Sequence, residues 1–440
     1  MVPHDAERWL SGPSPSACWA PASRGLSAAH HLDAPYVVHE RQPGPGGHVV
    51  TVEEDGFRFD RTGHLLHLRR PDVREWVTEL LGDQLLEVER NSRVFSHGRY
   101  TRYPYQANTY GLPPEIAFEC LRTFLEAAEV MDTVPEPATF EEFCLKHFGT
   151  GFSEHFMIPY NGKLWGVHPR EITADWCTRF VPLPDRDDVL AGAVGLNDRE
   201  LGYNAVFSYP RLGIGQLSSA LAEGVADHVQ YSSAPTAVDW RRRCLRFGDE
   251  EVPFEVLIST VPLDRLLDLM VDLPEDVAAA RGKLRCTSLQ YLDVALDVPC
   301  GVDLHWAYVP EPRFPFYRVG CYSNFSADMA PEGCSNLYVE LASRDVQDLD
   351  ALLPEVAAGL VEMGIISSPS DIRFARLRRL EHAYVLYDHG YAESLDRIRP
   401  FLDRNGIIST GRYGGWNYSS MEDALVFGID AARGAEKQLS

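Results

Sequence analysis

The chain has 440 residues, of which 45% are hydrophobic and 24% charged, and it carries a formal net charge of −23. A chain of this length can hold two or three domains and a large hydrophobic core. The negative charge argues against a nucleic-acid partner or an anionic membrane, because both bind basic surfaces. No apolar run is long enough to cross a bilayer, and the N-terminus lacks the apolar centre of a secretory signal. We therefore expect a cytoplasmic protein.

The 9 cysteines are scattered, with no C-x-x-C motif and no paired Cys/His cluster. Reduced thiols are therefore expected, and no metal site is predicted. His64 and His67 are three residues apart, but without further ligands this spacing is weak evidence for zinc. Nothing in the sequence indicates an oligomeric state.

The stretch from residue 25 to residue 67 has the pattern of a nucleotide-binding βαβ unit. A short helix of small residues is predicted over 26–32, and a buried strand that follows it ends in the acid Glu40. In dinucleotide-binding folds an acid at this position accepts hydrogen bonds from the adenosine ribose. The turns that come next contribute glycines and histidines, namely Gly46, Gly47, Gly63, His64 and His67.

The glycine-rich turn that should precede this helix is missing. A strand and a Gly-x-Gly-x-x-Gly turn are expected there, so that the helix N-terminus faces a pyrophosphate. The chain reads Ala17-Cys18-Trp19-Ala20-Pro21-Ala22-Ser23-Arg24-Gly25 instead, with only the last glycine in place. A frame that starts on the third base of the Cys18 codon can encode Leu-Gly-Ala-Gly-(Leu or Val)-Ala-Gly, and one dropped base then restores the written frame at Leu26. We hypothesise a frameshift within the first ~25 residues, in the gene or in its reading; the alternative is a genuine but unusual N-terminus.

Residues from about Pro71 to Gly149 are predicted to be largely helical. A helix over 114–130 opens with a Pro-Pro pair, and Thr139 to Glu142 has the capping-box form. We interpret residues 71–150 as a helical insertion that forms a lid or substrate domain; the alternative is a helical layer that only covers a sheet. The aromatic and turn residues from His155 to Gly166 are not expected to form a plain helix.

The second half of the chain shows the pattern of strands. Residues 256–261 form an apolar run that stops at Pro262, which is typical of a buried strand in a parallel sheet. An antiparallel sheet is predicted from the alternation within residues 289–296, 305–309, 317–322 and 337–341.

The C-terminal segment offers a second ligand-binding pattern. A strand is predicted to run into Gly411 and Arg412, and the helix that begins near Met421 has Ser419 or Ser420 as its cap. A strand, a glycine turn and a helix N-terminus together present backbone N–H groups to an electron-rich ligand.

These residues together resemble the flavoproteins with a glutathione-reductase-like FAD fold, which include amine oxidases, protoporphyrinogen oxidases and UDP-galactopyranose mutases. The resemblance covers nearly the whole chain, and the mutase pattern Tyr-x-x-Lys-x-Trp-Gly matches residues 160–166. The implied fold is α/β, with a Rossmann-like FAD-binding domain, a helical insertion and an antiparallel-sheet substrate domain. Residues 1–70, 205–265 and 400–440 would form the FAD-binding domain. Residues 151–204 and 266–399 would form the substrate-binding region beside the helical insertion.

The resemblance implies FAD as the cofactor and a small-molecule substrate, in the mutases a nucleotide sugar. Tyr160, Trp165, Arg179 and Tyr418 would bind the substrate, and Arg179 would clamp its diphosphate through the planar guanidinium. Because reduced flavin supplies the nucleophile in the mutases, no side chain is assigned a catalytic role. The residues assigned to the cofactor are Gly25, Glu40, Gly46, Gly47, Gly63, His64, His67, Gly411, Arg412, Ser420 and Met421.

One departure from the mutase pattern leaves other functions open. Mutases carry a second clamp in a Tyr-Arg-Ser-Leu pattern, whereas this chain reads Cys286-Thr287-Ser288-Leu289. Thr287 cannot bind a phosphate as a guanidinium does, although Arg285 or Arg318 could compensate. The alternatives are an FAD-dependent oxidoreductase of the amine oxidase or protoporphyrinogen oxidase type, and a degenerate relative that has lost FAD through its altered N-terminus.

Overall fold

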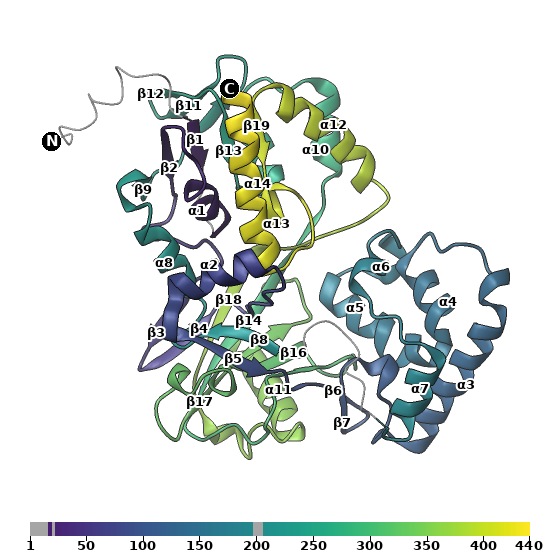
Figure 1. The fold of residues 1–440 in the computed structure, drawn as a ribbon. Helices are drawn as coiled ribbons and strands as arrows, with labels where there is room; N and C mark the ends of the chain where they lie inside the picture. Colours follow the sequence, from purple (N-terminus) through teal and green to yellow (C-terminus); the bar gives the residue numbers. More distant parts are fainter. Residues whose placement is uncertain (1–15, 20–22, 197–205) are drawn as a thin grey trace.

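A parallel sheet of five strands joins segments from both ends of the chain (Figure 1). The computed structural model describes residues 16–19, 23–196 and 206–440. All four strand pairs of this sheet are parallel. In chain order the strands are arranged 3-2-1-4-5, the order of dinucleotide-binding folds, which confirms the predicted fold class. Across the sheet they are β9 (Val229–Gln230), β2 (Tyr36–His39), β1 (Ser16–Trp19), β13 (Leu257–Ser259) and β19 (Ile407–Ser409).

Helices pack closely against this sheet. The short helix α1 (Ser23–Ala29) lies against α14 (Met421–Leu439), and Ser27 Oγ donates a 2.7 Å hydrogen bond to the carbonyl of Leu425. Gly428 of α14 permits this approach, because a Cβ there would lie only 2.5 Å from the backbone oxygen of Arg24. The other helices of this half are α2 (Pro71–Leu81), α8 (Gly215–Glu223), α9 (Leu263–Leu269), α10 (Glu275–Lys283), α12 (Tyr391–Arg404) and α13 (Gly411–Gly414).

A second, seven-stranded sheet forms the lower half of the molecule in Figure 1. Its antiparallel pairing along β14 to β17 confirms the alternation seen in the sequence. The helix α11 (Leu349–Glu362) packs beside it. The strand order is β18 (Ile372–Val385), β14 (Cys286–Leu296), β17 (Ser335–Leu341), β16 (Phe316–Cys321), β15 (Trp306–Tyr308), β6 (Ser92–Ser96) and β7 (Arg99–Arg102).

The prediction that residues 71–149 are largely helical is wrong between residues 85 and 102. Three strands lie there, namely residues 85–89, β6 and β7. β6 pairs in parallel with β15, and residues 85–89 pair with residues 206–210, more than a hundred residues away. Tertiary pairing overrides a local pattern that does not itself separate strand from helix. The remaining strands are β3 (Thr51–Glu54), β4 (Phe57–Asp60), β5 (Leu85–Glu89), β8 (Val206–Pro210), β10 (Ala237–Asp239), β11 (Cys244–Phe247) and β12 (Glu250–Pro253).

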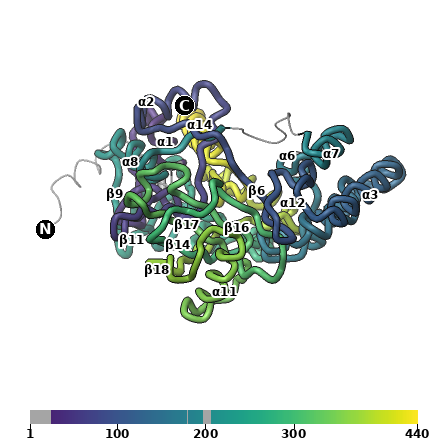
Figure 2. Tube along the Cα trace, turned by 90° about the horizontal axis from the view of Figure 1, so that it is seen from below, coloured from purple at the N-terminus to yellow at the C-terminus, as the bar shows by residue number. Residues whose placement is uncertain are grey.

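A helical lobe projects to one side of the two sheets, as both views show (Figures 1 and 2). The predicted helix over 114–130 and the capping box of Thr139 are confirmed. Gly149 has φ of +73°, and a Cβ there would lie 2.3 Å from the carbonyl oxygen of Thr123, so only glycine permits this helix crossing. The lobe contains α3 (Pro114–Val130), α4 (Phe140–Phe152), a π-helical turn (Ser153–Met157), α5 (Ile158–Trp165), α6 (Cys177–Phe180) and α7 (Arg186–Ala193).

The expectation that residues 155–166 avoid a plain helix is wrong for most of that stretch. The π-helical turn runs directly into α5, in which Pro159 occupies the first turn, where a missing N–H is tolerated. Gly166 ends α5 in the left-handed conformation that commonly stops a helix. The turn residues therefore mark the ends of this helix and do not prevent it.

No helix in the described part of the chain is both long and apolar enough to span a membrane. Within the same residues, no group of three or more His, Cys, Asp or Glu side chains could hold a metal ion.

Candidate functional site

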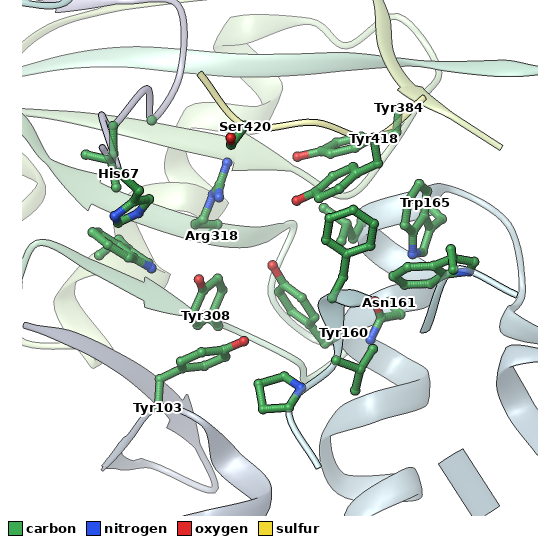
Figure 3. Close-up of a pocket in the computed structure, with 18 of the residues that line it drawn as sticks. His67, Tyr103, Tyr160, Asn161, Trp165, Tyr308, Arg318, Tyr384, Tyr418 and Ser420 are labelled. Atoms are coloured by element: carbon green, nitrogen blue, oxygen red, sulfur yellow. The ribbon is translucent and has the colours of Figure 1, made fainter. Parts of the chain in front are cut away.

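A pocket of about 380 Å³ opens where the seven-stranded sheet, the helical lobe and the start of α14 meet (Figure 3). Gly63, His67 and Ser420 from the predicted cofactor set line it together with Tyr160, Trp165 and Tyr418 from the predicted substrate set. The two sets thus meet in one cavity. Phe, Tyr and Trp supply 11 of its 26 lining residues, among them Tyr103, Trp176, Trp306, Tyr308, Tyr338 and Tyr384, which sequence reasoning did not select.

The three predicted substrate residues whose side chains are described lie on one side of the pocket. Tyr160 and Trp165 are placed there by α5, with ring-centroid distances of 5.3 Å from Tyr160 to Tyr308 and 6.1 Å from Trp165 to Tyr418. Tyr418 stacks on Tyr384 with its backbone N–H held by a hydrogen bond to Tyr387 Oη. This packing between three elements gives the wall a fixed shape.

Arg179 lies on α6, and its side chain lies outside the described part of the structure. Its neighbours Trp176 and Phe180 both line the pocket, so the backbone of α6 is close to the cavity. The role of Arg179 as a phosphate clamp stays a prediction.

Arg318 is the cation that the structure holds most firmly at this pocket. Its Nε donates to Glu340 Oε2 at 2.8 Å and a terminal nitrogen donates to Glu340 Oε1, while Glu340 itself is fully buried. Burial opposes the charge of Arg318, but Glu340 raises the pKa of the guanidinium well above its usual value. In Figure 3 the guanidinium points toward Ser420. The guanidinium is therefore charged near neutral pH, and the buried carboxylate of Glu340 balances that charge.

The structure distinguishes the two arginines that could replace the missing second clamp. Arg285 pairs with Asp388 and Glu171 at a half-exposed position and does not line the pocket, whereas Arg318 does. Next to Thr287 itself lies Arg344, whose Nε donates to Thr287 Oγ1 at 2.9 Å. The terminal nitrogens of Arg344 donate to backbone carbonyls of the last residue of β17 and of α5, so this guanidinium holds the fold together.

The predicted cofactor residues gather at the carboxyl edge of the parallel sheet. Glu40 follows β2 and is buried, and its carboxylate accepts a 2.6 Å hydrogen bond from the N–H of Gln42. Burial raises the pKa of Glu40. Gly25 lies within α1, and Gly411 begins α13 directly after β19. Ligands of open α/β sheets bind at this edge.

The remaining residues predicted to bind the cofactor lie between this edge of the sheet and the pocket. Gly46 and Gly47 form the turn beyond Glu40, where Val49 N–H donates to the carbonyl of Gly46 at 2.8 Å. Arg412 donates to the carbonyl of Ser419 at 2.8 Å, and its guanidinium lies 4.6 Å from the ring centroid of Tyr418. Ser420 caps α14 as predicted, with Met421 as the first residue of that helix and Asp423 completing the capping box.

Several buried polar atoms around the loop from Gly411 to Ser420 fit a bound polar cofactor. Among the described residues, no hydrogen-bond partner exists for His64 Nδ1, Asn417 Oδ1 or Ser419 Oγ. Buried polar groups are normally paired, and a bound FAD would supply donors and acceptors to such atoms. Burial lowers the pKa of His64 to about 4, so this ring is neutral at pH 7.

Arg24 does not fit the interpretation of this region as a cofactor site. Burial lowers the pKa of its guanidinium to about 10, and a Cβ on Gly411 would lie 2.2 Å from its Cδ. A long cationic side chain is therefore wedged against the glycine that should approach the cofactor. Residues 20–22, in the middle of the segment where the glycine-rich turn is expected, lie outside the described residues, so the frameshift hypothesis stays a hypothesis. Arg24 belongs to the segment that the hypothesised frameshift would change.

Comparisons with known proteins agree with this geometry. A family model described as flavin containing amine oxidoreductase matches residues 25–435. A reduced UDP-galactopyranose mutase is 26% identical, with a TM-score of 0.90 over 98% of this chain and 95% of that chain. Cyclohexylamine oxidase from Brevibacterium oxydans is 14% identical, with a TM-score of 0.72 over 97% of this chain and 100% of that chain. A putrescine oxidase bound to putrescine is 15% identical, with a TM-score of 0.67 over 96% and 99%. The two oxidases share the fold.

Proposed function

Because the chain belongs to the family of flavin-containing amine oxidoreductases, we propose that this FAD-dependent enzyme acts on a nucleotide-linked sugar, as a UDP-galactopyranose mutase does. The observation that carries the proposal is that Tyr160, Trp165 and Tyr418, which match the mutase pattern, line one pocket together with three arginines. In a chain with a net charge of −23, the charged residues that line the cavity are Arg69, Arg90, Arg318 and Asp423.

These guanidinium groups suit an anionic substrate better than an amine, although acids balance two of them: Glu340 pairs with Arg318, and Glu422 and Asp423 pair with Arg69. An alkyl amine is a cation near neutral pH, and the one carboxylate among the described lining residues, Asp423, already has an arginine within ion-pair distance. A diphosphate would accept hydrogen bonds from the N–H groups of Arg318 that Glu340 does not occupy.

The side chains of the pocket have binding and positioning roles in this proposal. When bound, reduced FAD supplies the nucleophile, which is why the pocket needs no acid and base pair of its own. Arg318 would hold the diphosphate and stabilise the negative charge that grows on it as the bond to the sugar breaks. The rings of Trp165 and Tyr384 would exclude water, and the hydroxyls of Tyr160 and Tyr418 would donate hydrogen bonds to the substrate.

The test is a turnover assay with UDP-galactopyranose and chemically reduced enzyme. We expect ring-contracted product to form only after flavin reduction, with no net consumption of reductant per turnover. Consumption of one oxidant per turnover with an amine, and no reaction of the nucleotide sugar, would overturn the proposal in favour of an oxidase.

The second candidate is a relative that no longer binds FAD. The specific observation in its favour is Arg24, which fills the space beside Gly411. The visible absorption spectrum of the purified protein separates this candidate from the first, because only a flavoprotein absorbs near the flavin bands.

A further inference from the structure

Arg344 does not line the pocket, but its guanidinium is bound to three elements around it. Its Nε donates to Thr287 Oγ1 at 2.9 Å, and one terminal nitrogen donates to the carbonyl of Leu341 at 3.0 Å. The other terminal nitrogen donates to the carbonyls of Lys163 and Leu164, at 2.7 and 2.6 Å. This side chain therefore joins β14 and the last residue of β17 to the end of α5.

The two carbonyls on α5 lie at the helix end, where backbone acceptors have no partner within the helix. The N–H of Gly166 donates to the carbonyl of Gly162 at 3.0 Å, which leaves the carbonyls of residues 163–165. Arg344 binds two of these three, and a cation at this position also interacts favourably with the helix dipole. Gly166 permits the approach, because a Cβ there would lie 2.7 Å from Arg344 Nε.

The same helix forms part of the pocket wall. Four of its eight residues line the cavity, namely Tyr160, Asn161, Leu164 and Trp165. Figure 3 shows Trp165 and Tyr160 on the side of the pocket that this helix supplies. The ring centroid of Trp165 lies 5.2 Å from that of Trp176 and 5.5 Å from that of Tyr384. A shift of the last turn of α5 would change this packing, and that turn is the one to which Arg344 is bound.

We propose that Arg344 is a positioning residue of the pocket. It holds the last turn of α5 where Tyr160 and Trp165 would meet the substrate, and the hydroxyl of Thr287 orients its guanidinium. The threonine that stands in place of the arginine of the mutase pattern thus has a role of its own in this chain. The step from the pocket wall to the substrate rests on the proposed function of the same site.

Hydrogen exchange measured by mass spectrometry, on the protein as purified and without substrate, tests the contact itself. We expect Arg344→Gln to accelerate exchange of the α5 amides about tenfold or more, because charge-assisted hydrogen bonds to the helix end are lost. Thr287→Val, which replaces the hydroxyl by a methyl group, should accelerate exchange less, and Thr287→Ser should leave it unchanged. The matched control Arg243→Gln removes an exposed arginine that donates to the carbonyl of Glu255 at 3.2 Å, and it should not change exchange in α5.

Calorimetric titration with UDP tests the consequence for binding. We expect Arg344→Gln to bind UDP about tenfold more weakly than wild-type protein. In protein that also carries Trp165→Phe, the additional loss should shrink to less than about threefold, because both changes act through the same wall and their effects are not additive. A purely structural role of Arg344 would give the same loss in both backgrounds.

Three results would overturn the inference. Unchanged exchange of α5 in Arg344→Gln would show that other contacts suffice, such as the hydrogen bonds from Lys163 Nζ to the carbonyls of residues 309, 311 and 316. Exchange that accelerates equally over the whole chain would show a general loss of stability. An unchanged UDP affinity in Arg344→Gln would separate α5 from the ligand site and leave the proposed function intact.

Failure of the proposed function gives a different result. Wild-type protein would then bind no UDP, whereas Arg344→Gln would still accelerate exchange in α5 alone. That outcome would support the placement of the pocket wall by Arg344 and would refute a nucleotide sugar as the substrate.

Discussion

The two halves of the site treat buried polar groups in different ways. In the substrate pocket, Arg318 and Glu340 satisfy each other through a two-point ion pair. At the edge of the parallel sheet, His64 Nδ1 and Asn417 Oδ1 are buried without a hydrogen-bond partner among the described residues. A pocket that recognises a substrate by charge must fix its cation before the substrate arrives. A cradle whose partners come from a resident cofactor keeps polar atoms unsatisfied until that cofactor binds.

The largest expected effect concerns the residues around Gly411 and His64 at the edge of the parallel sheet, which we call the cradle. Protein expressed with the frame-corrected N-terminus should show a flavin absorption spectrum, because the restored glycines let the backbone approach the FAD diphosphate. Protein with the written N-terminus should show little or none, since Arg24 lies against Gly411.

Spectra of the two purified forms, recorded at equal protein concentration, decide whether FAD binding requires the frame-corrected N-terminus. Equal flavin content in both forms would show that the missing glycines are dispensable. No flavin in either form would favour the relative that has lost its cofactor.

The ion pair of the pocket should be the costliest single contact to break. Glu340→Ala leaves Arg318 buried and unpaired, and we expect a loss of about 3–5 kcal/mol in the free energy of unfolding. The control is Glu362→Ala, which breaks a similar two-point pair with Arg313 at a half-exposed position. That variant should lose less than about 1 kcal/mol. Equal losses in denaturant titrations of the two variants would show that the pair of the pocket has no special role.

Sequence reasoning was most successful where one local rule governs the structure. The helix over 114–130 and the caps at Thr139 and Ser420 depend on residues within a few positions of each other, and all three are confirmed. Of the strands between residues 85 and 102, β5 and β6 have partners more than a hundred residues away, and β7 pairs with β6 in a short hairpin. The long-range partners cannot be read from the local pattern, which is why these strands were missed.

The same limit explains which pocket residues were missed. Tyr160, Trp165 and Tyr418 belong to recurring motifs, and all three line the cavity. Arg90 and Trp306 belong to no motif and meet only because β6 pairs with β15. The signal that could have identified Arg90 is an arginine at the end of a strand in an otherwise acidic chain, but the sequence does not show which surface that strand faces.

Loss of the predicted clamp on α6 should have a smaller effect than loss of the buried pair. Arg179→Ala removes one charged donor fork, and we expect UDP to bind about 10- to 100-fold more weakly. The control Arg170→Ala removes an exposed arginine of the same lobe, and it should leave the affinity unchanged. An unchanged UDP affinity of Arg179→Ala in calorimetric titrations would remove the role assigned to this residue.

The smallest expected effect is on the pH dependence of stability, and it follows from the buried histidines of the cradle. Burial lowers the pKa of His48 to about 3 and that of His64 to about 4, whereas an unfolded histidine titrates near 6.5. Between pH 6.5 and 4 the unfolded chain therefore binds more protons than the folded chain. The free energy of unfolding is therefore undiminished by these histidines above pH 6.5, and it decreases as the pH falls toward 4.

His64→Gln should make the decline in unfolding free energy between pH 6.5 and 4.5 less steep, by on the order of 1–2 kcal/mol. The exposed His389 gives the matched control, because His389→Gln should leave the slope as it is in the wild-type protein. Denaturant titrations across this pH range measure the difference. An unchanged slope in His64→Gln would mean that the ring is hydrated or protonated in the folded protein. The cradle would then be open to water, whereas the carboxylate of Glu340 at the substrate pocket is fully buried.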